Sequence, residues 1–567
     1  MLSRYTVKFG GESGQGINTL GKLLSKAVKD SGYPNFAYRE YPSLIKGGVA
    51  SYQIDISEDV ISSSSRYTDF LVVLKKSALD KYLKDLSPKG TIIHDIEQLQ
   101  LTPSQAEYVK KNDISIIYLN VKEIAESVKA PLIMANMVTL GFIWKVLKLD
   151  IKILKTIVKE YFSNKKNIDI EAEYRCLQAG YDLKEIEQIK NISPIKKGKK
   201  GWYKSISLTG NDSIALGALS AGCKAYYAYP MTPATSILEI LGKLSKETGM
   251  VIKQAENEIT AAQLCIGSMY MGARAFTATS GGGFDLMTET ISFAGISETP
   301  LVIVLAQRNG PGTGVPTWTG AGDLNVAINS GHGEFPRCVI SLSDVRDSYT
   351  LTQKAFNIAE KYQLPVIILT EKQISESLFN VIDLPKPIKI ERSLKEGKNR
   401  YEVTESGVSN RWLPNSKSST YMQTSDEHTV QGWSTDESKD VSQMMEKRFK
   451  KIQTLKKELP GPKYFGSKDA DIVFVGYGSV KNSVIDMMNL TDRKIGYLHY
   501  EYLYPIKTEK LIKIYEDGAR LIAIENNQSG ELTELIRQNC GFEIPEKLLK
   551  FDGRPFFVED ILDYIKQ

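Results

Sequence analysis

The sequence predicts an α/β protein built from three doubly wound parallel-sheet domains. Short apolar runs, for example at residues 70–74, 115–119 and 301–306, alternate with longer segments in which apolar residues recur every three to four positions. Such alternation of strand and helix patterns is typical of parallel sheets covered by helices. In the middle of the chain, glycine-rich turns follow strand ends repeatedly, as at residues 280–283. This places candidate ligand-binding loops at one edge of a sheet.

Composition narrows the class of protein. The chain has 567 residues, of which 42% are hydrophobic and 25% charged, with a net charge of +5. These values describe a globular protein of several domains and argue against nucleic-acid or membrane binding. The five cysteines and four histidines are scattered without a C-x-x-C, so we expect neither a metal site nor an iron–sulfur cluster on this chain. No apolar stretch suits a signal peptide or a membrane span, which predicts a cytoplasmic location.

Shifts in pattern divide the chain into five segments. We expect an α/β domain at 1–192, a basic linker at 193–204, a second α/β domain at 205–384, a long loop ending in an amphipathic helix at 385–465, and a third α/β domain at 466–567. The loop loses periodicity but keeps aromatic residues, which argues against plain disorder. His428 within it is expected to be a surface or packing residue, with a catalytic acid as the alternative.

The first domain opens with a strand at 5–9, a glycine-rich turn, and a helix from about residue 17 to 31. The turn contains Gly11, Gly14 and Gly16 in the spacing G-x-x-G-x-G. The dinucleotide fingerprint is G-x-G-x-x-G, so a nicotinamide cofactor is disfavoured. The turn serves either a phosphate-bearing ligand or close packing of the strand against the helix.

The second domain is organised around Tyr229-Pro230-Met231-Thr232-Pro233. This stretch joins a strand at 224–229 to a helix at 234–248. We therefore place Thr232 at the helix N-cap and Pro233 at its first position. A strand that ends at a helix N-terminus offers backbone donors to a carboxylate or phosphate, although Thr232 as a plain cap is an open alternative.

Further candidate groups follow the next three strands. Glu256 and Glu258 come after the strand at 251–254, at the start of a helix rich in small residues. Either carboxylate is a plain helix-start charge or a group that shares a proton with a basic nitrogen. The other two strands end at Ser280, which precedes three glycines, and at Gln307, which precedes Arg308.

Several sequence blocks stand in a fixed order. They are TGNDSIALGA, YPMTPAT, QAENEITAAQLCIGSMYMGARAFTATSGGGFDLMTE, AQRNGPGTGVPT and GHGEFPR. Together they resemble the α chain of the 2-oxoacid:ferredoxin oxidoreductases, and GGESGQG and YPSLIKGGVASY resemble the γ domain of that family, here fused at the N-terminus. The resemblance spans nearly the whole chain. It implies that 1–192 is γ-type, 205–384 binds the pyrimidine of thiamine diphosphate, 385–465 wraps that domain, and 466–567 is transketolase C-terminal-like.

The resemblance also implies roles for single residues. Thr232 would hydrogen-bond the 2-oxoacid carboxylate, within a substrate site that includes Tyr229, Pro230 and Pro233. Its spacing from the later glycine selects Glu258 over Glu256 as the residue that holds a proton on the aminopyrimidine of the cofactor. Cofactor contacts would come from Ser280, Gly281 and Gly282, and a coenzyme A or phosphate contact from Gly11, Gly14 and Gly16.

Of the positions at which the chain departs from the family pattern, one matters most for the substrate. Many relatives carry an arginine after G-x-P-T that contacts the substrate carboxylate, whereas this chain has Trp318. A tryptophan cannot pair with a carboxylate but can line an apolar pocket. Either Arg308 or Arg337 takes over the charge, or the substrate is an aryl or branched 2-oxoacid, such as indolepyruvate or 2-oxoisovalerate.

Features that thiamine chemistry needs are missing from the sequence. No G-D-G run followed by asparagine, which would hold diphosphate and Mg²⁺, and no cysteine cluster for [4Fe–4S] occurs. The family carries both on a β subunit, so the resemblance implies an α subunit that shares thiamine diphosphate with a β partner in an (αβ)₂ complex. The reaction would decarboxylate a 2-oxoacid, transfer the acyl group to coenzyme A and pass electrons to ferredoxin. A non-catalytic scaffold of the same fold is the alternative.

Overall fold

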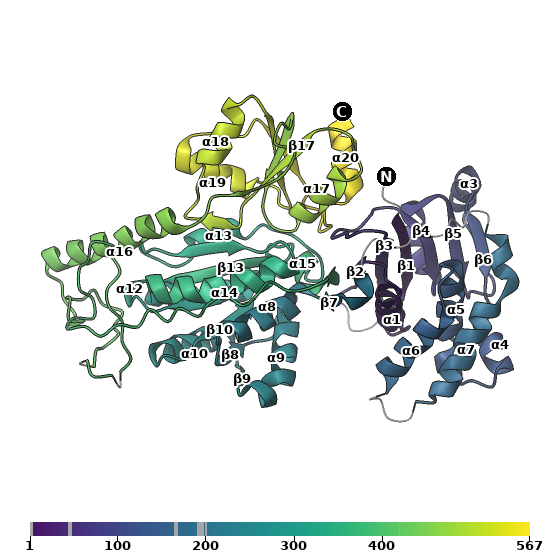
Figure 1. Ribbon diagram of the computed structural model, residues 1–567, viewed down its shortest axis with the longest axis horizontal. Helices are drawn as coiled ribbons and strands as arrows, with labels where there is room; N and C mark the ends of the chain where they lie inside the picture. The colour runs from purple at the N-terminus through teal and green to yellow at the C-terminus, as the bar shows by residue number, and fades with distance from the viewer. Residues whose placement is uncertain are drawn as a thin grey trace.

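The computed structural model describes residues 4–43, 48–163, 168–189, 195, 198, 201–414, 416–418 and 420–566. Within these residues the strands form sheets of six, seven and five strands and one two-stranded ribbon. Figure 1 shows the six-stranded sheet at one end of the molecule, and the C-terminal domain lying over the central one. Half of the predicted linker at 193–204 lies outside the described residues.

The N-terminal sheet has the strand order β2-β3-β1-β4-β5-β6. Strands β1, β4, β5 and β6 are parallel, as predicted, whereas β3 pairs antiparallel with both β1 and β2. One half of the sheet is therefore mixed. The elements are β1 (Arg4–Glu12), α1 (Ile17–Asp30), β2 (Asn35–Glu40), β3 (Val49–Ser57), β4 (Thr68–Val73), α2 (Lys76–Tyr82), β5 (Leu86–His94), α3 (Pro103–Lys111), β6 (Ser115–Tyr118), α4 (Val121–Ser127), α5 (Asn136–Val146), α6 (Ile151–Phe162) and α7 (Ile170–Asp182).

The central sheet has the order β18-β12-β13-β11-β10-β8-β9. Strands β11 and β13 are buried along their whole length, as expected for parallel strands covered on both faces. The elements of the central domain, including the ribbon strands β7 and β14, are β7 (Ile206–Leu208), α8 (Gly210–Ser220), β8 (Ala225–Ala228), α9 (Thr235–Thr248), β9 (Val251–Gln254), α10 (Glu258–Tyr270), β10 (Ala275–Thr279), α11 (Gly281–Leu286), α12 (Thr288–Ile296), β11 (Leu301–Gln307), α13 (Leu324–Asn329), β12 (Cys338–Ser341), α14 (Val345–Tyr362), β13 (Pro365–Glu371), α15 (Lys372–Glu376) and β14 (Phe379–Val381).

The C-terminal sheet has the order β15-β17-β16-β19-β20. This domain lends β18 to the central sheet, where it pairs antiparallel with β12. The two domains consequently share one hydrophobic core. The elements are β15 (Lys463–Gly466), β16 (Ile472–Gly476), α17 (Val480–Met488), β17 (Ile495–His499), β18 (Tyr502–Tyr504), α18 (Glu509–Glu516), β19 (Arg520–Glu525), α19 (Glu531–Cys540), β20 (Glu546–Leu549) and α20 (Val558–Lys566).

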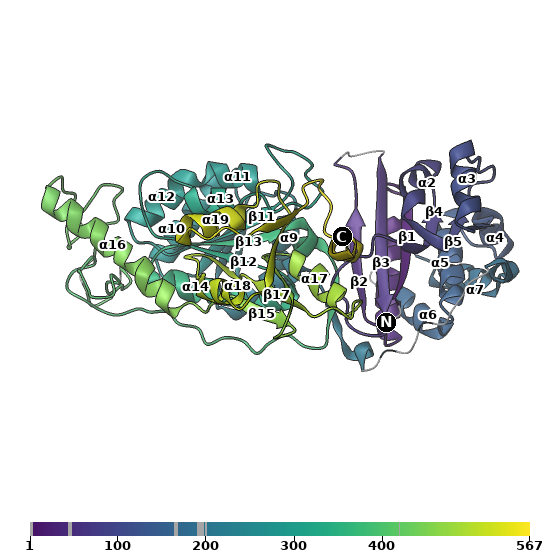
Figure 2. The ribbon, with the colours of Figure 1, turned by 90° about the horizontal axis from the view of Figure 1, so that it is seen from above.

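The N-terminal domain joins the rest of the molecule through the edge strand β2. The short strand β14 pairs with β7, and a bridge between Ala37 and Leu378 continues this pairing onto β2. Phe36 and Phe379 meet there edge to face at 5.0 Å between ring centroids. Seen from above, β2 is the strand of its sheet that faces the central domain (Figure 2). An apolar contact therefore fixes the N-terminal domain against the central one.

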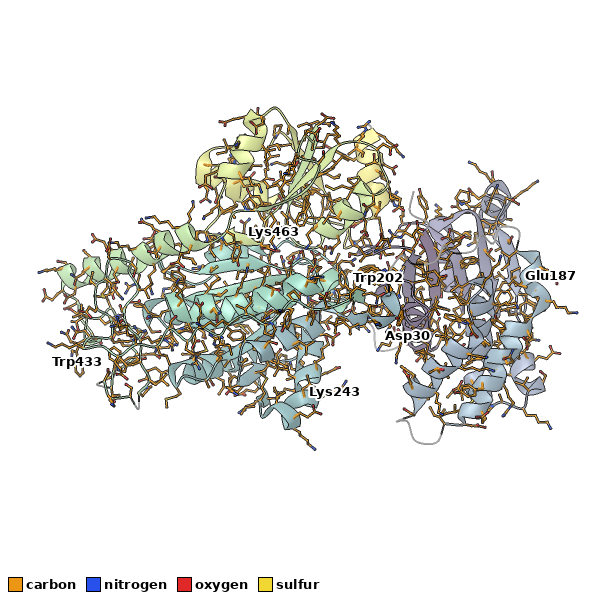
Figure 3. The ribbon with its side chains drawn as sticks, in the orientation of Figure 1. Asp30, Glu187, Trp202, Lys243, Trp433 and Lys463 are labelled. Atoms are coloured by element: carbon orange, nitrogen blue, oxygen red, sulfur yellow. The ribbon has the colours of Figure 1, made fainter. Side chains whose placement is uncertain are left out.

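The segment between β14 and α16 (Ser438–Glu458) wraps the central domain with little regular structure. Figure 3 places Trp433 at its outer end, where the side chain is 64% exposed. His428, by contrast, is fully buried, and its ring centroid lies 3.9 Å from that of Tyr401. Burial lowers the pKa of His428. These observations place His428 in the packing of the segment, as predicted.

Two buried carboxylates anchor this wrapping segment. Glu298, at the end of α12, forms ion pairs with Lys447 and Lys451 of α16. Glu360 of α14 pairs with three arginines, at 2.7 Å from Arg274, 2.9 Å from Arg411 and 3.0 Å from Arg392. The predicted amphipathic helix is thus held by ion pairs as well as by apolar residues.

Among the described residues, no helix has both the length and the apolar character required to cross a bilayer.

Candidate active site at the carboxyl edge of the central sheet

The carboxyl ends of β8, β10 and β11 lead into the three loops that carry the predicted site. Asn211 holds the first loop. Its Nδ2 donates to the carbonyl oxygen of Pro233 at 2.7 Å and to Oγ of Ser236 at 2.7 Å. Asn211 does not cap α8, because Thr209 is the N-cap of that helix, in a capping box with Asp212. Asn211 is a positioning residue for the loop, and its place in the TGND block was the available signal.

Thr232 and Pro233 do not have the helical positions that the sequence predicted. Helix α9 begins at Thr235, with Ala234 as its N-cap, and no side chain caps it. The preceding residues form a separate turn, in which the amide of Ala234 donates to the carbonyl of Met231 at 2.8 Å. Because this turn has its own hydrogen bond, the helix starts later than the T-P dipeptide suggests. The Thr232 hydroxyl is consequently not needed to cap the helix.

Glu258 is the first residue of α10 and is 3% exposed. Asn257 caps the helix by accepting from the amide of Thr260 at 2.9 Å. The Oε1 atom of Glu258 is buried and has no hydrogen-bond partner within the described part of the chain. Glu256, two residues earlier, is exposed and accepts a hydrogen bond from the Thr260 hydroxyl at 3.2 Å. Only Glu258 therefore has the burial expected of a proton-transfer group.

Gly283 makes room for this carboxylate. A Cβ atom at residue 283 would lie 2.5 Å from Oε1 of Glu258 and 2.1 Å from Oγ1 of Thr279. Such distances are too short for any side chain, so the position requires glycine. Thr279 also donates to the sulfur of Met231 at 3.8 Å. The first loop, the end of β10 and Glu258 thus form one packed cluster.

Ser280 and the following glycines are arranged differently from the predicted four-residue turn. Helix α11 already begins at Gly281, with Ser280 as its N-cap residue. The Ser280 hydroxyl is fully buried and has no partner in the described structure. Because the glycines have no side chains, the first turn of α11 can lie close to β10. A helix therefore begins where the sequence suggested a loop.

Arg308 connects the third loop to the first. Its Nη1 donates to the carbonyl oxygen of Thr232 at 3.0 Å. Arg308, Gly281, Gly282 and Asp323 line a cavity of about 400 Å³ whose far wall is formed by C-terminal residues such as Asn527. Burial lowers the pKa of Arg308, and burial, reinforced by Asp285, raises the pKa of Asp323 to about 6. The cavity therefore contains a cation next to the Thr232 loop.

Arg337 does not reach this cavity. Its guanidinium is buried, donates to Oγ of Ser330 at 3.0 Å, and lies 4.2 Å from the centroid of the Phe335 ring. Of the two arginines considered for the substrate charge, the geometry leaves Arg308.

Trp318 does not line the cavity either. Its backbone follows Thr317, whose hydroxyl donates to the carbonyl of Tyr41 at 2.6 Å, and precedes Thr319, whose amide donates to the carbonyl of Gly553 at 3.2 Å. These contacts hold Trp318 where the three domains meet. Trp318 therefore contacts the neighbouring domains, because the loop that follows Pro316 turns toward them.

The glycine-rich turn of the N-terminal domain is also shorter than predicted. Strand β1 continues to Glu12, so Gly11 lies within the strand, paired with Ala50. Gly14 and Gly16 have positive φ angles of 97° and 79° in the turn before α1. A Cβ at Gly16 would lie 2.8 Å from Nδ2 of Asn136, whereas the space around Gly14 is open. Gly16 thus serves close packing against α5.

Comparisons with known proteins agree with this arrangement. Residues 216–447 match the family described as "Pyruvate flavodoxin/ferredoxin oxidoreductase, thiamine diP-bdg", and residues 6–183 match "Pyruvate ferredoxin/flavodoxin oxidoreductase". The chain is 30% identical to the 2-oxoglutarate synthase subunit KorA of Methanothermobacter marburgensis, over 63% of this chain and 97% of that protein. The chain belongs to the 2-oxoacid:ferredoxin oxidoreductase family. It is similar to its α subunits.

Two other matches cover nearly the whole chain. A 2-oxoacid:ferredoxin oxidoreductase subunit alpha from Sulfolobus sp is 29% identical over 97% of this chain and 95% of that protein. A solved 2-oxoglutarate:ferredoxin oxidoreductase from Magnetococcus marinus, with 2-oxoglutarate, coenzyme A and succinyl-CoA bound, has 26% identity and a TM-score of 0.90, covering 99% of both chains. The predicted fold class and the fusion of a γ-type domain to an α chain are thereby confirmed.

Proposed function

We propose that the cluster around Glu258 is the pyrimidine-binding half of a thiamine diphosphate site, in the α subunit of a 2-oxoacid:ferredoxin oxidoreductase. The observation that carries this proposal is the buried, unpartnered Oε1 atom of Glu258 beside Gly283. A buried carboxylate oxygen without a partner is costly, so its retention indicates a ligand that completes it.

The residues present fit such a cofactor. Glu258 and Ser280 each carry a buried oxygen without a partner in the described structure. Gly283 keeps the space beside Glu258 free of a side chain, and Gly281 and Gly282 do the same where they line the neighbouring cavity. When bound, thiamine diphosphate supplies the carbon nucleophile that adds to the ketone and the electron sink for decarboxylation. Glu258 would hold and release a proton at Oε1, facing a ring nitrogen of the aminopyrimidine. Ser280 and the glycines would orient that ring.

The substrate site would lie in the neighbouring loop. Thr232 offers a hydroxyl, and Arg308 adds a guanidinium that is already fixed to the Thr232 carbonyl. Together they would bind the carboxylate of the 2-oxoacid as a charge-assisted pair. Tyr229, Pro230 and Pro233 would hold the loop, with Asn211 beneath it. Since Trp318 lies outside the cavity, no contact in the structure favours an aryl or branched substrate over 2-oxoglutarate or pyruvate.

The co-substrate, the electron acceptor and the partner chain are proposed from two sources. These are the relatives of this chain and the motifs that the chain itself lacks. The Magnetococcus enzyme binds coenzyme A, and we infer the same co-substrate here. We further propose a β partner that carries the diphosphate, Mg²⁺ and [4Fe–4S] sites, assembly as (αβ)₂, and ferredoxin as the electron acceptor.

The test is turnover by the complex reconstituted with its partner chain. Glu258→Gln should lower kcat by about 10²–10⁴-fold, the usual contribution of a positioned acid or base. Glu256→Gln is the matched control, because the same change two residues earlier removes an exposed carboxylate. Equal activities of the two variants would refute the assignment of Glu258. If the partner chain were also fully active without the wild-type chain, the scaffold alternative would be favoured.

A further inference from the structure

A second cationic site lies where the three domains meet. The guanidinium carbon of Arg554 is 3.3 Å from the centroid of the Trp318 ring, and Nζ of Lys81 is 5.1 Å from the same centroid. Arg554 comes from the loop before α20, Trp318 from the central domain and Lys81 from α2. The indole of Trp318 thus contacts one cation from the N-terminal domain and one from the C-terminal domain.

Arg554 lacks an anionic partner within the described part of the chain. No described residue accepts a hydrogen bond from its guanidinium or lies within ion-pair distance of it. The neighbouring charges are otherwise engaged: Lys8 pairs with Asp85 at 3.2 Å and Lys81 with Glu40 at 3.8 Å. A guanidinium that stacks on an aromatic ring keeps its in-plane N–H donors available for a planar or tetrahedral oxyanion.

The pKa shifts of the groups around Arg554 indicate an excess of positive charge there. Burial and the nearby Arg554 lower the pKa of Lys81, although Glu40 opposes the shift. Burial disfavours the charge on Glu40, yet Lys8, Lys81 and Arg554 together hold its pKa below its ordinary value. Each of these directions is the response expected when positive charges outnumber negative ones in a partly desolvated place.

Buried Lys372 adds to the excess. Its ammonium lies 3.9 Å from the centroid of the Tyr38 ring and donates to the backbone carbonyl of Arg39, with no carboxylate of the described chain within ion-pair distance. Burial lowers its pKa to about 8. An incoming anion would therefore find a preorganised cationic junction whose side chains range from exposed at Lys81 to fully buried at Lys372.

We propose that Arg554, Trp318 and Lys81 form an oxyanion-binding site at the domain junction that receives an anionic group of a substrate of this enzyme. A second carboxylate of the 2-oxoacid, remote from the one placed at Thr232 and Arg308, and the phosphates of coenzyme A share this chemistry. The proposal rests on the proposed function. Trp318, which replaces an arginine found in many relatives, would then act as the platform on which Arg554 supplies a guanidinium from another domain.

The experiment compares Arg554→Gln with Arg537→Gln in the reconstituted complex. Arg537 is the matched control, because it is an exposed arginine of the same domain that pairs only with Glu534 on its own helix. The KM for the 2-oxoacid is measured at saturating coenzyme A, and the KM for coenzyme A at saturating 2-oxoacid. We expect Arg554→Gln to raise one KM at least tenfold while kcat changes less than threefold, and Arg554→Lys to recover part of the loss.

The arms of the experiment separate the two sources of the anion. A higher KM for the 2-oxoacid alone identifies its second carboxylate, and a higher KM for coenzyme A alone identifies its phosphates. Calorimetric titration of the complex with inorganic pyrophosphate measures binding without turnover. An inactive wild-type complex would therefore refute the proposed function, and the pyrophosphate titration would still decide whether Arg554 binds an anion. Unchanged KM values together with unchanged pyrophosphate binding in Arg554→Gln and in Lys81→Gln would overturn the inference.

Discussion

Three buried glutamates of the central domain differ in what surrounds them. Glu298 and Glu360 each form ion pairs with two or more basic side chains, whereas Oε1 of Glu258 has no partner among the described residues. All three side chains are at most 3% exposed. The first two fasten the wrapping segment to the domain. The comparison teaches that burial alone does not mark a catalytic carboxylate, since a structural one is neutralised by the fold and a functional one is left incomplete.

The largest stability effect is expected at Glu298. Glu298→Gln leaves Lys447 and Lys451 buried without an anion, which should cost about 3–5 kcal/mol. We expect the thermal midpoint of the central domain to fall by about 10 °C, measured by calorimetry. Glu458→Gln is the control, because Glu458 pairs with Lys361 on the surface and should change stability by less than about 1 kcal/mol. Similar midpoints for the two variants would contradict the role of Glu298.

The same ion pairs predict a pH dependence. Burial raises the pKa of Glu298, but Lys447, Lys451 and Arg400 outweigh it and hold the value below that of an ordinary glutamate. The stabilisation is therefore present above the unfolded pKa of about 4.3 and is lost as pH falls through the lower folded value. Thermal midpoints of the wild-type chain should decline below about pH 4, and those of Glu298→Gln should decline less. Parallel curves would show that Glu298 does not contribute.

A smaller effect is expected where Asn211 supports the substrate loop. Asn211→Ala removes the donors to the Pro233 carbonyl and to Ser236, and should cost about 1–3 kcal/mol. Because the loop carries Thr232, we expect the KM for the 2-oxoacid to rise by several fold in steady-state kinetics. A loss of stability with an unchanged KM would restrict Asn211 to a structural role.

The smallest effect concerns Asp323. Its pKa of about 6 means that the carboxyl is neutral below this pH and ionised above it, where it competes with the substrate for Arg308. The KM for the 2-oxoacid should therefore rise as pH increases through about 6, and Asp323→Asn should flatten this part of the profile. A profile that keeps its slope in the variant would remove Asp323 from the site.

Local pattern was sufficient for much of the fold. The strands at β4, β9 and β11 and the start of α10 at Glu258 follow the predicted positions within one or two residues. Short runs of β-branched and apolar residues, such as those of β4 and β11, define such strands whatever their neighbours are. The antiparallel pairing of β3 and the transfer of β18 to the central sheet were not predictable, because both depend on contacts between segments far apart in sequence.

The site shows the same division. Glu258 and Thr232 were found through sequence blocks, but the helix start at Thr235 depends on a turn that a T-P dipeptide does not reveal. Trp318 was expected to line an apolar substrate pocket because it stands where the resemblance places a substrate-binding arginine in many relatives. Its actual partner, Arg554, lies more than two hundred residues away, and no spacing rule connects the two. Asp323 was missed because an isolated aspartate carries no motif.

The central claim is that the fold leaves Glu258 incomplete in order to receive a ligand. It is tested most directly by the thermal midpoint of Glu258→Gln in the chain without cofactor or partner. Replacing a buried carboxyl oxygen that has no partner in the described structure should leave the midpoint unchanged or raise it by a few degrees. A fall comparable to that of Glu298→Gln would show that Glu258 is bound into the structure as firmly as the other two glutamates, and would contradict the account.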